Sequence, residues 1–295
     1  MRKTFSRGAL LMMLAAFFFS LMAAFVKLSG KRLPSQEIVL FRSIVVLGIT
    51  AALIRRKKLP FFGNNRKLLF LRGLTGFLAL TALYFTLTHI PITDSVMLHF
   101  TNPLFAGILA GVLLKEKSSK SEWIFYLAAF AGIVLIINPG FSIGLLPAAI
   151  GLGGALCSAT AYNLVRKLRS DDHPLTIIFY LPLVSIIFSI PIVAPGFVMP
   201  RGWEWLALLG VGLATQLAQI FLTLSLHAEK TARVANVSYL TVVFSTIFGI
   251  FFWNEIPQWN TILGSIIVLY AIFRISRIPE EEAPNMRSEV DVLMK

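Results

Sequence analysis

Cysteine and charge are both scarce in this chain of 295 residues. Cys157 is its only cysteine, which excludes an internal disulfide and a cysteine-based metal cluster. Charged residues make up 14% of the chain, whereas soluble domains average about 25%. Hydrophobic residues make up 57%, more than a soluble core of this size can bury, so we expect lipid to cover the remainder.

The motifs of several enzyme classes are missing as well. The sequence contains no Walker loop, no His, Cys and Glu residues at metal-ligand spacing, and no nucleophile–base pair. The glycines within residues 151–154 lie in an apolar run, where small residues favour close helix packing over phosphate binding. We therefore expect no enzymatic activity, no cofactor, no metal and no ATP-driven step.

Ten apolar runs are present, each long enough to cross about 30 Å of hydrocarbon as a helix. They cover residues 8–29, 36–54, 68–89, 94–114, 122–138, 144–165, 174–194, 203–226, 231–252 and 258–275. The predicted fold class is all-α, a polytopic membrane protein with ten transmembrane helices. The polar segment 279–295 is predicted to be a disordered cytoplasmic tail.

The formal net charge of +13 comes from bases in the short segments between the apolar runs. In a soluble protein such an excess would suggest nucleic acid, but here we expect the lipid bilayer and no nucleic acid. With the N-terminus in the cytoplasm, 22 of the 27 lysines and arginines face inward and four face outward. This positive-inside excess predicts a protein of the plasma (bacterial inner) membrane with both termini cytoplasmic.

The two halves of the sequence resemble each other at a nearly constant spacing. The matched pairs are Lys27 with Lys167, Pro34 with Pro174, Gly73 with Gly212, Phe105 with Phe244, and Glu116 with Glu255. Each half, residues 8–138 and 144–275, holds five predicted helices, so the second enters the membrane inverted. Inverted repeats are a device of alternating-access transporters, although a gene duplication alone can also build a helical bundle.

These features carry a family resemblance that covers residues 8–275. A segment of the form Pro-x-Phe, Leu-x-x-Glu and Gly closes each half: Pro103, Phe105, Glu116 and Gly132 in the first, and Phe244, Glu255 and Gly264 in the second. The chain thereby resembles the drug/metabolite transporter superfamily, EamA-type. It departs from the pattern at Lys115 and Asn254, where Gly is usual, and the second copy lacks the Pro. The resemblance implies transport of a small-molecule substrate, with helices 122–138 and 258–275 at the periphery.

Arg42 is the sharpest candidate for a functional residue. It lies about six residues into the predicted helix 36–54, roughly 9 Å from the outer end. A charge at that depth is costly and usually faces a partner or a cavity. Arg42 therefore either anchors a substrate carboxylate or phosphate, or is a structural or snorkelling residue, paired with Glu37.

His99 and Asn102 are three residues apart in the predicted helix 94–114, which places them on one face. Together they are expected to line one wall of a site, and His99 would couple transport to protons near neutral pH. The alternative for His99 is a hydrogen bond between helices.

The second half contributes uncharged polar residues near mid-membrane. Gln216 and Gln219 share a face of helix 203–226, and Asn236 and Tyr239 share a face of helix 231–252. Such donors, acceptors and an aromatic surface suit a neutral or zwitterionic organic solute. The alternative is interhelical hydrogen bonding worth about 0.6 kcal/mol each. Tyr84, Tyr162 and Asn163 are weaker candidates.

Three acidic residues at helix ends are assigned structural roles. Asp94 is expected to complement a helix dipole, and Glu116 and Glu255 to tie loops or gates together.

The favoured function is a secondary carrier for an amino acid, a nucleoside or an S-adenosyl-type compound. A broad-specificity exporter, and a membrane assembly factor or intramembrane enzyme, are the alternatives. Direction, coupling and a homodimeric state stay open.

Overall fold

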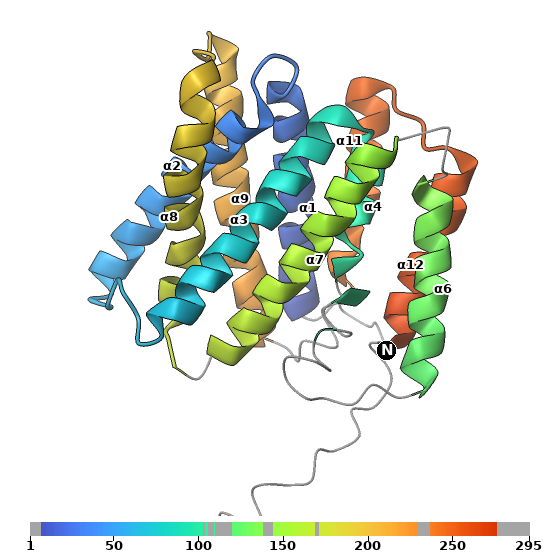
Figure 1. Ribbon diagram of the computed structural model, residues 1–295, viewed down its shortest axis with the longest axis horizontal. Helices are drawn as coiled ribbons and strands as arrows, with labels where there is room; N and C mark the ends of the chain where they lie inside the picture. Colours follow the sequence, from blue (N-terminus) through green and yellow to red (C-terminus); the bar gives the residue numbers. More distant parts are fainter. Residues whose placement is uncertain are drawn as a thin grey trace, which may run out of the picture.

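The computed structural model describes residues 7–102, 104, 105, 109, 120–137, 144–168, 171–228 and 237–275. All regular structure in these residues is helical (Figure 1). The helices are α1 (Arg7–Ser29), α2 (Ser35–Arg56), α3 (Arg66–His89), α4 (Ile92–His99), α6 (Lys120–Ile137), α7 (Leu145–Leu168), α8 (Pro174–Val193), a 3₁₀ turn η1 (Ala194–Gly196), α9 (Trp203–Ala228), α11 (Leu240–Trp253) and α12 (Trp259–Ile275).

Six of the described helices are long and apolar enough to cross a membrane, namely α1, α2, α3, α7, α8 and α9. Shorter apolar helices lie within α6, α11 and α12. The all-helical prediction is thus confirmed, and the chain is a multi-pass membrane protein. The predicted tail, residues 279–295, lies outside the described residues.

Two of the predicted helices are interrupted by a turn. The run 94–114 was predicted to be one helix, but α4 ends at His99, a turn follows at Phe100 and Thr101, and the described residues 102, 104, 105 and 109 are helical again. The Thr101 hydroxyl donates to the Leu98 carbonyl oxygen at 2.6 Å and closes this turn locally. In the run 231–252, residues 237 and 238 are helical, a turn at Tyr239 follows, and α11 begins at Leu240; residues 231–236 lie outside the described residues.

Helix ends follow the local sequence. Pro34 and Pro91 occupy the residues before α2 and α4, where a missing N–H is harmless. The Asn65 side chain accepts a hydrogen bond from the Leu68 N–H and caps α3. Asn254 ends α11 in the left-handed conformation, with φ of 57°, a position that asparagine tolerates better than most residues.

The main bundle is built from three helix pairs. α1 packs on α9, α3 packs on α7, and α2 crosses α8. A glycine sits at two of the remaining contacts: a Cβ on Gly73 of α3 would lie 2.7 Å from the Val184 side chain of α8, and one on Gly212 of α9 would lie 2.7 Å from the Val45 side chain of α2. These glycines let the helix backbones approach closely.

α6 and α12 pack against each other at one edge of the molecule (Figure 1). A Cβ on Gly132 would lie 2.8 Å from the Gly264 carbonyl oxygen, and a Cβ on Gly264 would lie 2.5 Å from the Gly132 carbonyl oxygen. The pair is therefore a close backbone contact that only glycine permits. The expected peripheral position of these two helices is confirmed.

Candidate functional site

Arg42 lies in the first half of α2 and is 3% exposed. Its Nε and Nη1 atoms have no hydrogen-bond partner among the described residues. The predicted alternative, an ion pair with Glu37, is wrong, because Glu37 Oε2 instead accepts a hydrogen bond from the Val198 N–H at 3.0 Å. The electrostatic partner of Arg42 is Tyr84.

Tyr84 of α3 and Thr215 of α9 complete the surroundings of Arg42. Tyr84 is fully buried, and its hydroxyl makes no hydrogen bond of good geometry among the described residues, although the Arg42 and Thr215 side chains lie near enough for weaker polar interactions. Gln216, the next residue of α9, is also buried, and its Oε1 lacks a partner there. Three helices, α2, α3 and α9, thus contribute buried polar groups with unused hydrogen-bonding capacity.

Arg72 is a second, partly buried arginine of the bundle: it lies within the predicted helix 68–89, and its charge is among the 22 that are expected to face the cytoplasm. It lies six residues inside α3, and its Nε and Nη1 atoms are buried without a hydrogen-bond partner among the described residues. Its charge interacts with Tyr162 of α7 and with Arg42. A signal was available in the sequence: Arg72 directly precedes Gly73, a residue matched in the repeat and therefore one inside a packed helix.

His99 and Asn102 do not share a helix face, because α4 ends at His99. The Asn102 Nδ2 donates to Ser158 Oγ of α7 at 3.0 Å, a hydrogen bond between helices. The His99 ring contacts that of Phe100 edge-on, and Phe100 in turn contacts Tyr239, with ring centroids 5.6 Å apart. These residues form a separate group from Arg42 and Tyr84 in the contacts that the structure describes.

The other candidates are spread over several elements. Asn163 is buried on α7, Tyr162 beside it is 55% exposed, and Gln219 is half-buried on α9. Asn236 and Glu116 lie outside the described residues.

One end of the bundle is tied by ionic contacts. Lys27 Nζ of α1 lies 2.6 Å from Glu255 Oε1 and donates to the Ile90 carbonyl oxygen at 2.8 Å. Glu255 Oε2 also accepts from the Ile92 N–H at 3.0 Å. Glu255 therefore joins α1, the start of α4 and the link between α11 and α12, as expected for a residue that ties loops. Asp94 lies within electrostatic range of both Lys27 and Glu255.

A second ion pair lies at the same end. Arg32, in the link between α1 and α2, pairs with Glu204 at the start of α9, and Glu204 also accepts from the Arg201 N–H at 2.7 Å. The hydrogen bond from Arg32 to this carboxylate raises the pKa of Arg32. Both ion pairs at this end therefore join a segment of the first half to one of the second.

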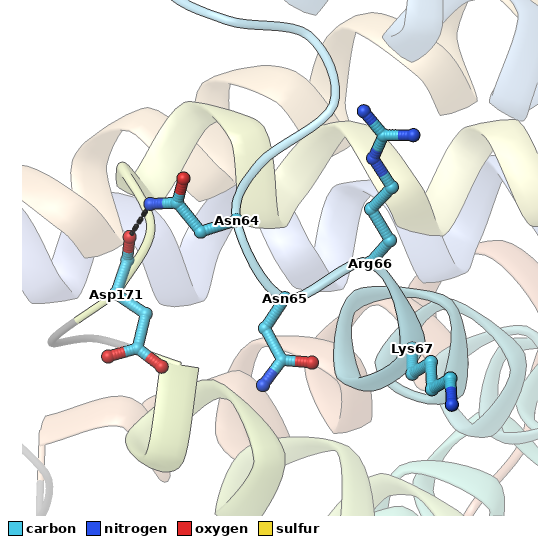
Figure 2. A pocket seen from close by; sticks show the side chains of 5 residues that line it. All are labelled: Asn64, Asn65, Arg66, Lys67 and Asp171. Atoms are coloured by element: carbon cyan, nitrogen blue, oxygen red, sulfur yellow. Dashed lines mark hydrogen bonds between the residues drawn. The ribbon is translucent and has the colours of Figure 1, made fainter.

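The opposite end holds a surface pocket of about 750 Å³ (Figure 2). It is lined by Asn64, Asn65, Arg66, Lys67 and Asp171. Asn64 Nδ2 donates to the Asp171 carbonyl oxygen at 2.7 Å, and the Asn64 N–H donates to Asp172 Oδ1 at 2.6 Å. Figure 2 shows the charged ends of Arg66, Lys67 and Asp171 pointing apart, so the pocket is a junction between two links rather than a converging site. No predicted site residue lines it.

Among the described residues, no cluster of three His, Cys, Asp or Glu side chains could hold a metal ion. The chemistry available at Arg42 is instead that of anion and hydroxyl recognition, with guanidinium N–H donors and the phenol of Tyr84.

The EamA-like transporter family matches this chain twice, over residues 6–138 and 145–277. The chain is 32% identical over 272 residues to the pseudopaline exporter CntI of Pseudomonas aeruginosa, covering 92% of this chain and 96% of that relative. It is 30% identical over 280 residues to solute carrier family 35 member G1 of Homo sapiens, covering 89% of this chain and 76% of the relative. A protein of known crystal structure is 16% identical with a TM-score of 0.65, covering 92% of this chain and 96% of that one, which supports the fold alone.

Proposed function

The chain belongs to the EamA-like transporter family of the drug/metabolite transporter superfamily, and from that premise we propose that it is a secondary carrier for a small polar organic metabolite. The substrate class is an amino acid, a nucleoside or an S-adenosyl-type compound. It crosses the plasma (bacterial inner) membrane by alternating access, without enzymatic chemistry. The named relatives are an exporter and a solute carrier, which agrees with transport rather than catalysis.

The observation that carries this proposal is that Nε and Nη1 of Arg42 are buried without a hydrogen-bond partner among the described residues. Taking an ion of this size out of water costs several kcal/mol, even after the protein relaxes. The described carboxylates contact groups other than Arg42, so no described acidic residue offsets the charge of Arg42. The carboxylate of an amino acid or of an S-adenosyl-type compound, bound between α2, α3 and α9, would supply the missing partner, and a nucleoside would use the neutral donors and acceptors of Tyr84 and Gln216 instead.

Helix packing supports a repeat of two inverted five-helix halves, residues 8–138 and 144–275, with ten membrane spans. The shift along the sequence that takes Gly73 to Gly212 converts the Gly73–Val184 contact into the Gly212–Val45 contact, with the roles of the two halves exchanged. The same operation exchanges the α1–α9 pair with the α7–α3 pair. Two-fold related contacts of this kind are expected of an inverted repeat.

The repeat also indicates that the fold can form without an arginine at the position of Arg42. At the same shift, Leu181 occupies the position that Arg42 occupies in the first half. The architecture is therefore built with an apolar side chain in one half, and the charge in the other half serves a different purpose. Substrate recognition is the role that requires such asymmetry.

The loop charges favour both termini in the cytoplasm, and the Lys27–Glu255 end then faces outward. The ionic contacts close this end, and alternating access requires them to break when it opens. CntI is named as an exporter, which favours outward transport as the direction. The buried polar side chains of Arg42, Tyr84 and Gln216 favour a selective carrier over a broad-specificity exporter, whose cavity would be mainly aromatic.

The test is uptake and counterflow in proteoliposomes over a panel of amino acids, nucleosides and vitamins, with and without a pH gradient. We expect at least one compound to be transported, and we expect Arg42→Ala and Gln219→Ala to abolish its transport while folded protein is still produced. Wild-type rates in both variants would remove the proposed site. Rates that do not change with the pH gradient would remove His99 as a proton carrier.

A further inference from the structure

Arg72 adds a second, partly buried positive charge to the first half. A Cβ on Gly76, one turn further along α3, would lie 3.0 Å from Arg72 Nη1 and 2.8 Å from Leu181 Cδ1 of α8. The glycine therefore leaves the space that the guanidinium occupies beside α8. Nε and Nη1 of Arg72 are shielded from solvent, yet they have no hydrogen-bond partner among the described residues.

The two arginines form parallel units, each with its own tyrosine. Arg42 interacts with Tyr84, and Arg72 interacts with Tyr162. The two guanidinium groups are also close enough for their charges to repel each other. Each unit offers N–H donors and a phenolic O–H, a combination that fits an acidic group of a ligand.

No described carboxylate relieves this repulsion. Glu37 accepts from Val198, Glu204 pairs with Arg32, and Glu255 pairs with Lys27. Asp171 and Asp172 lie at the link beside Asn64, and Asp94 lies near Glu255 and Lys27. Two like charges in a medium of low dielectric destabilise one another unless an anion lies between or beside them.

The repeat shows that the fold does not need the second arginine. The shift that takes Gly73 to Gly212 also takes Arg72 to Val211, a fully buried residue of α9. Arg42 and Arg72 therefore both correspond to aliphatic residues of the second half, Leu181 and Val211.

Resting on the carrier function proposed above, we propose that the transported solute bears two separate acidic groups, one bound at Arg42 and Tyr84 and the other at Arg72 and Tyr162. This narrows the substrate class to small organic di-acids, including amino acids with an acidic side chain. Arg72 is a specificity-determining residue in this arrangement, because it distinguishes a second carboxylate from its uncharged amide.

The test compares di-acids with their half-amides, which have nearly the same shape but lack one charge. The probes are L-glutamate against L-glutamine, and linear dicarboxylates from malonate to pimelate against the corresponding half-amides. Binding is measured as thermal stabilisation of the detergent-purified protein, and transport is measured as counterflow in proteoliposomes. We expect at least one di-acid to bind about tenfold or more tightly than its half-amide, as a charge-assisted hydrogen bond supplies.

Arg72→Val, which installs the residue of the second half, is expected to abolish that preference while leaving half-amide binding in place. Gly76→Ala is expected to reduce the preference by displacing the Arg72 side chain. Arg66→Gln, which removes the same charge from the exposed start of α3, is the matched control and should keep the preference.

Two results would overturn the inference. One is that no di-acid is preferred over its half-amide. The other is that Arg72→Val weakens di-acid and half-amide binding equally, as a purely structural arginine would. Transport of an uncharged nucleoside together with the first result would leave the carrier function standing and refute only the di-acid assignment. Arg42→Leu with unchanged transport of every probe would refute the carrier site itself.

Discussion

Replacing Arg42 by leucine separates a functional charge from a structural one. Arg42 is 3% exposed, its Nε and Nη1 lack partners among the described residues, and leucine is what the repeat places at the corresponding position, Leu181. If Arg42 serves to bind the substrate, its removal should raise the stability of the substrate-free protein and lower the transport rate. If Arg42 serves the fold, stability and transport rate should both fall.

The magnitude follows from desolvation. Exchanging buried ionic groups for well-packed hydrophobic residues is often neutral or stabilises a protein by about 1–4 kcal/mol. No described carboxylate pairs with Arg42 and would be left stranded by the exchange, so the exchange should be stabilising rather than neutral. Burying the leucine side chain contributes about 1.5–3 kcal/mol of transfer free energy, partly replacing the contacts of the arginine stem. We expect Arg42→Leu to be more stable than the parent by about 2 kcal/mol.

The assay is unfolding of the purified protein in a mild detergent, followed by tryptophan fluorescence, alongside counterflow in proteoliposomes at equal protein density. Arg66→Leu is the control for a charge removed from an exposed position of the same bundle. The expected pattern is a higher unfolding midpoint with transport lost. A loss of stability of more than about 1 kcal/mol, or transport at the parental rate, would refute the reasoning.

Three further predictions concern contacts outside this site. Glu255→Gln leaves Lys27 without its carboxylate and should lower the free energy of unfolding by about 3 kcal/mol. Adding Lys27→Met to this variant should restore part of the loss, whereas additive losses in the double variant would argue against the ion pair. Gly264→Ala should destabilise the protein by about 1–3 kcal/mol because its Cβ would lie 2.5 Å from the Gly132 carbonyl oxygen. Transport should persist, because α6 and α12 are peripheral. Gly153→Ala, whose Cβ would have nothing within 4 Å, is the control, and equal unfolding midpoints for the two variants would contradict the close contact of α6 with α12. Asn102→Ala and Ser158→Ala should each lower the free energy of unfolding by about 1 kcal/mol and reduce transport little, because the hydrogen bond between them joins the segment after α4 to α7. Complete loss of transport in Asn102→Ala, but not in Ser158→Ala, would instead place Asn102 in the substrate site.

The helical fold could be derived from the sequence because hydropathy is a local property. A run such as residues 8–29 must be helical in lipid whatever its neighbours are, since each backbone polar group needs a partner within the run. The constant spacing between the two halves is equally readable, and it aligned Gly73 with Gly212 before their contacts were known. Glu255 was likewise assigned a tying role from its place in the repeat and at a helix end.

The interaction partners of the buried charged residues were decided only by the tertiary structure. Spacing along the sequence suggested Glu37 as the partner of Arg42, but Glu37 accepts a hydrogen bond from the Val198 N–H, and the Arg42 guanidinium lies near Tyr84. Arg72 is among the charges expected to face the cytoplasm, whereas close packing of α3 on α7 and α8 buries its Nε and Nη1.

The split between local and tertiary information has one physical cause. Transfer into lipid depends on the composition of each segment, and so the sequence determined which segments are apolar helices and which half each belongs to. The tilt and rotation of a helix depend on the shapes of its neighbours, such as the glycines that admit Val184 and Val45. Those contacts alone decided that two arginines from different helices lie inside the bundle with no described acidic partner.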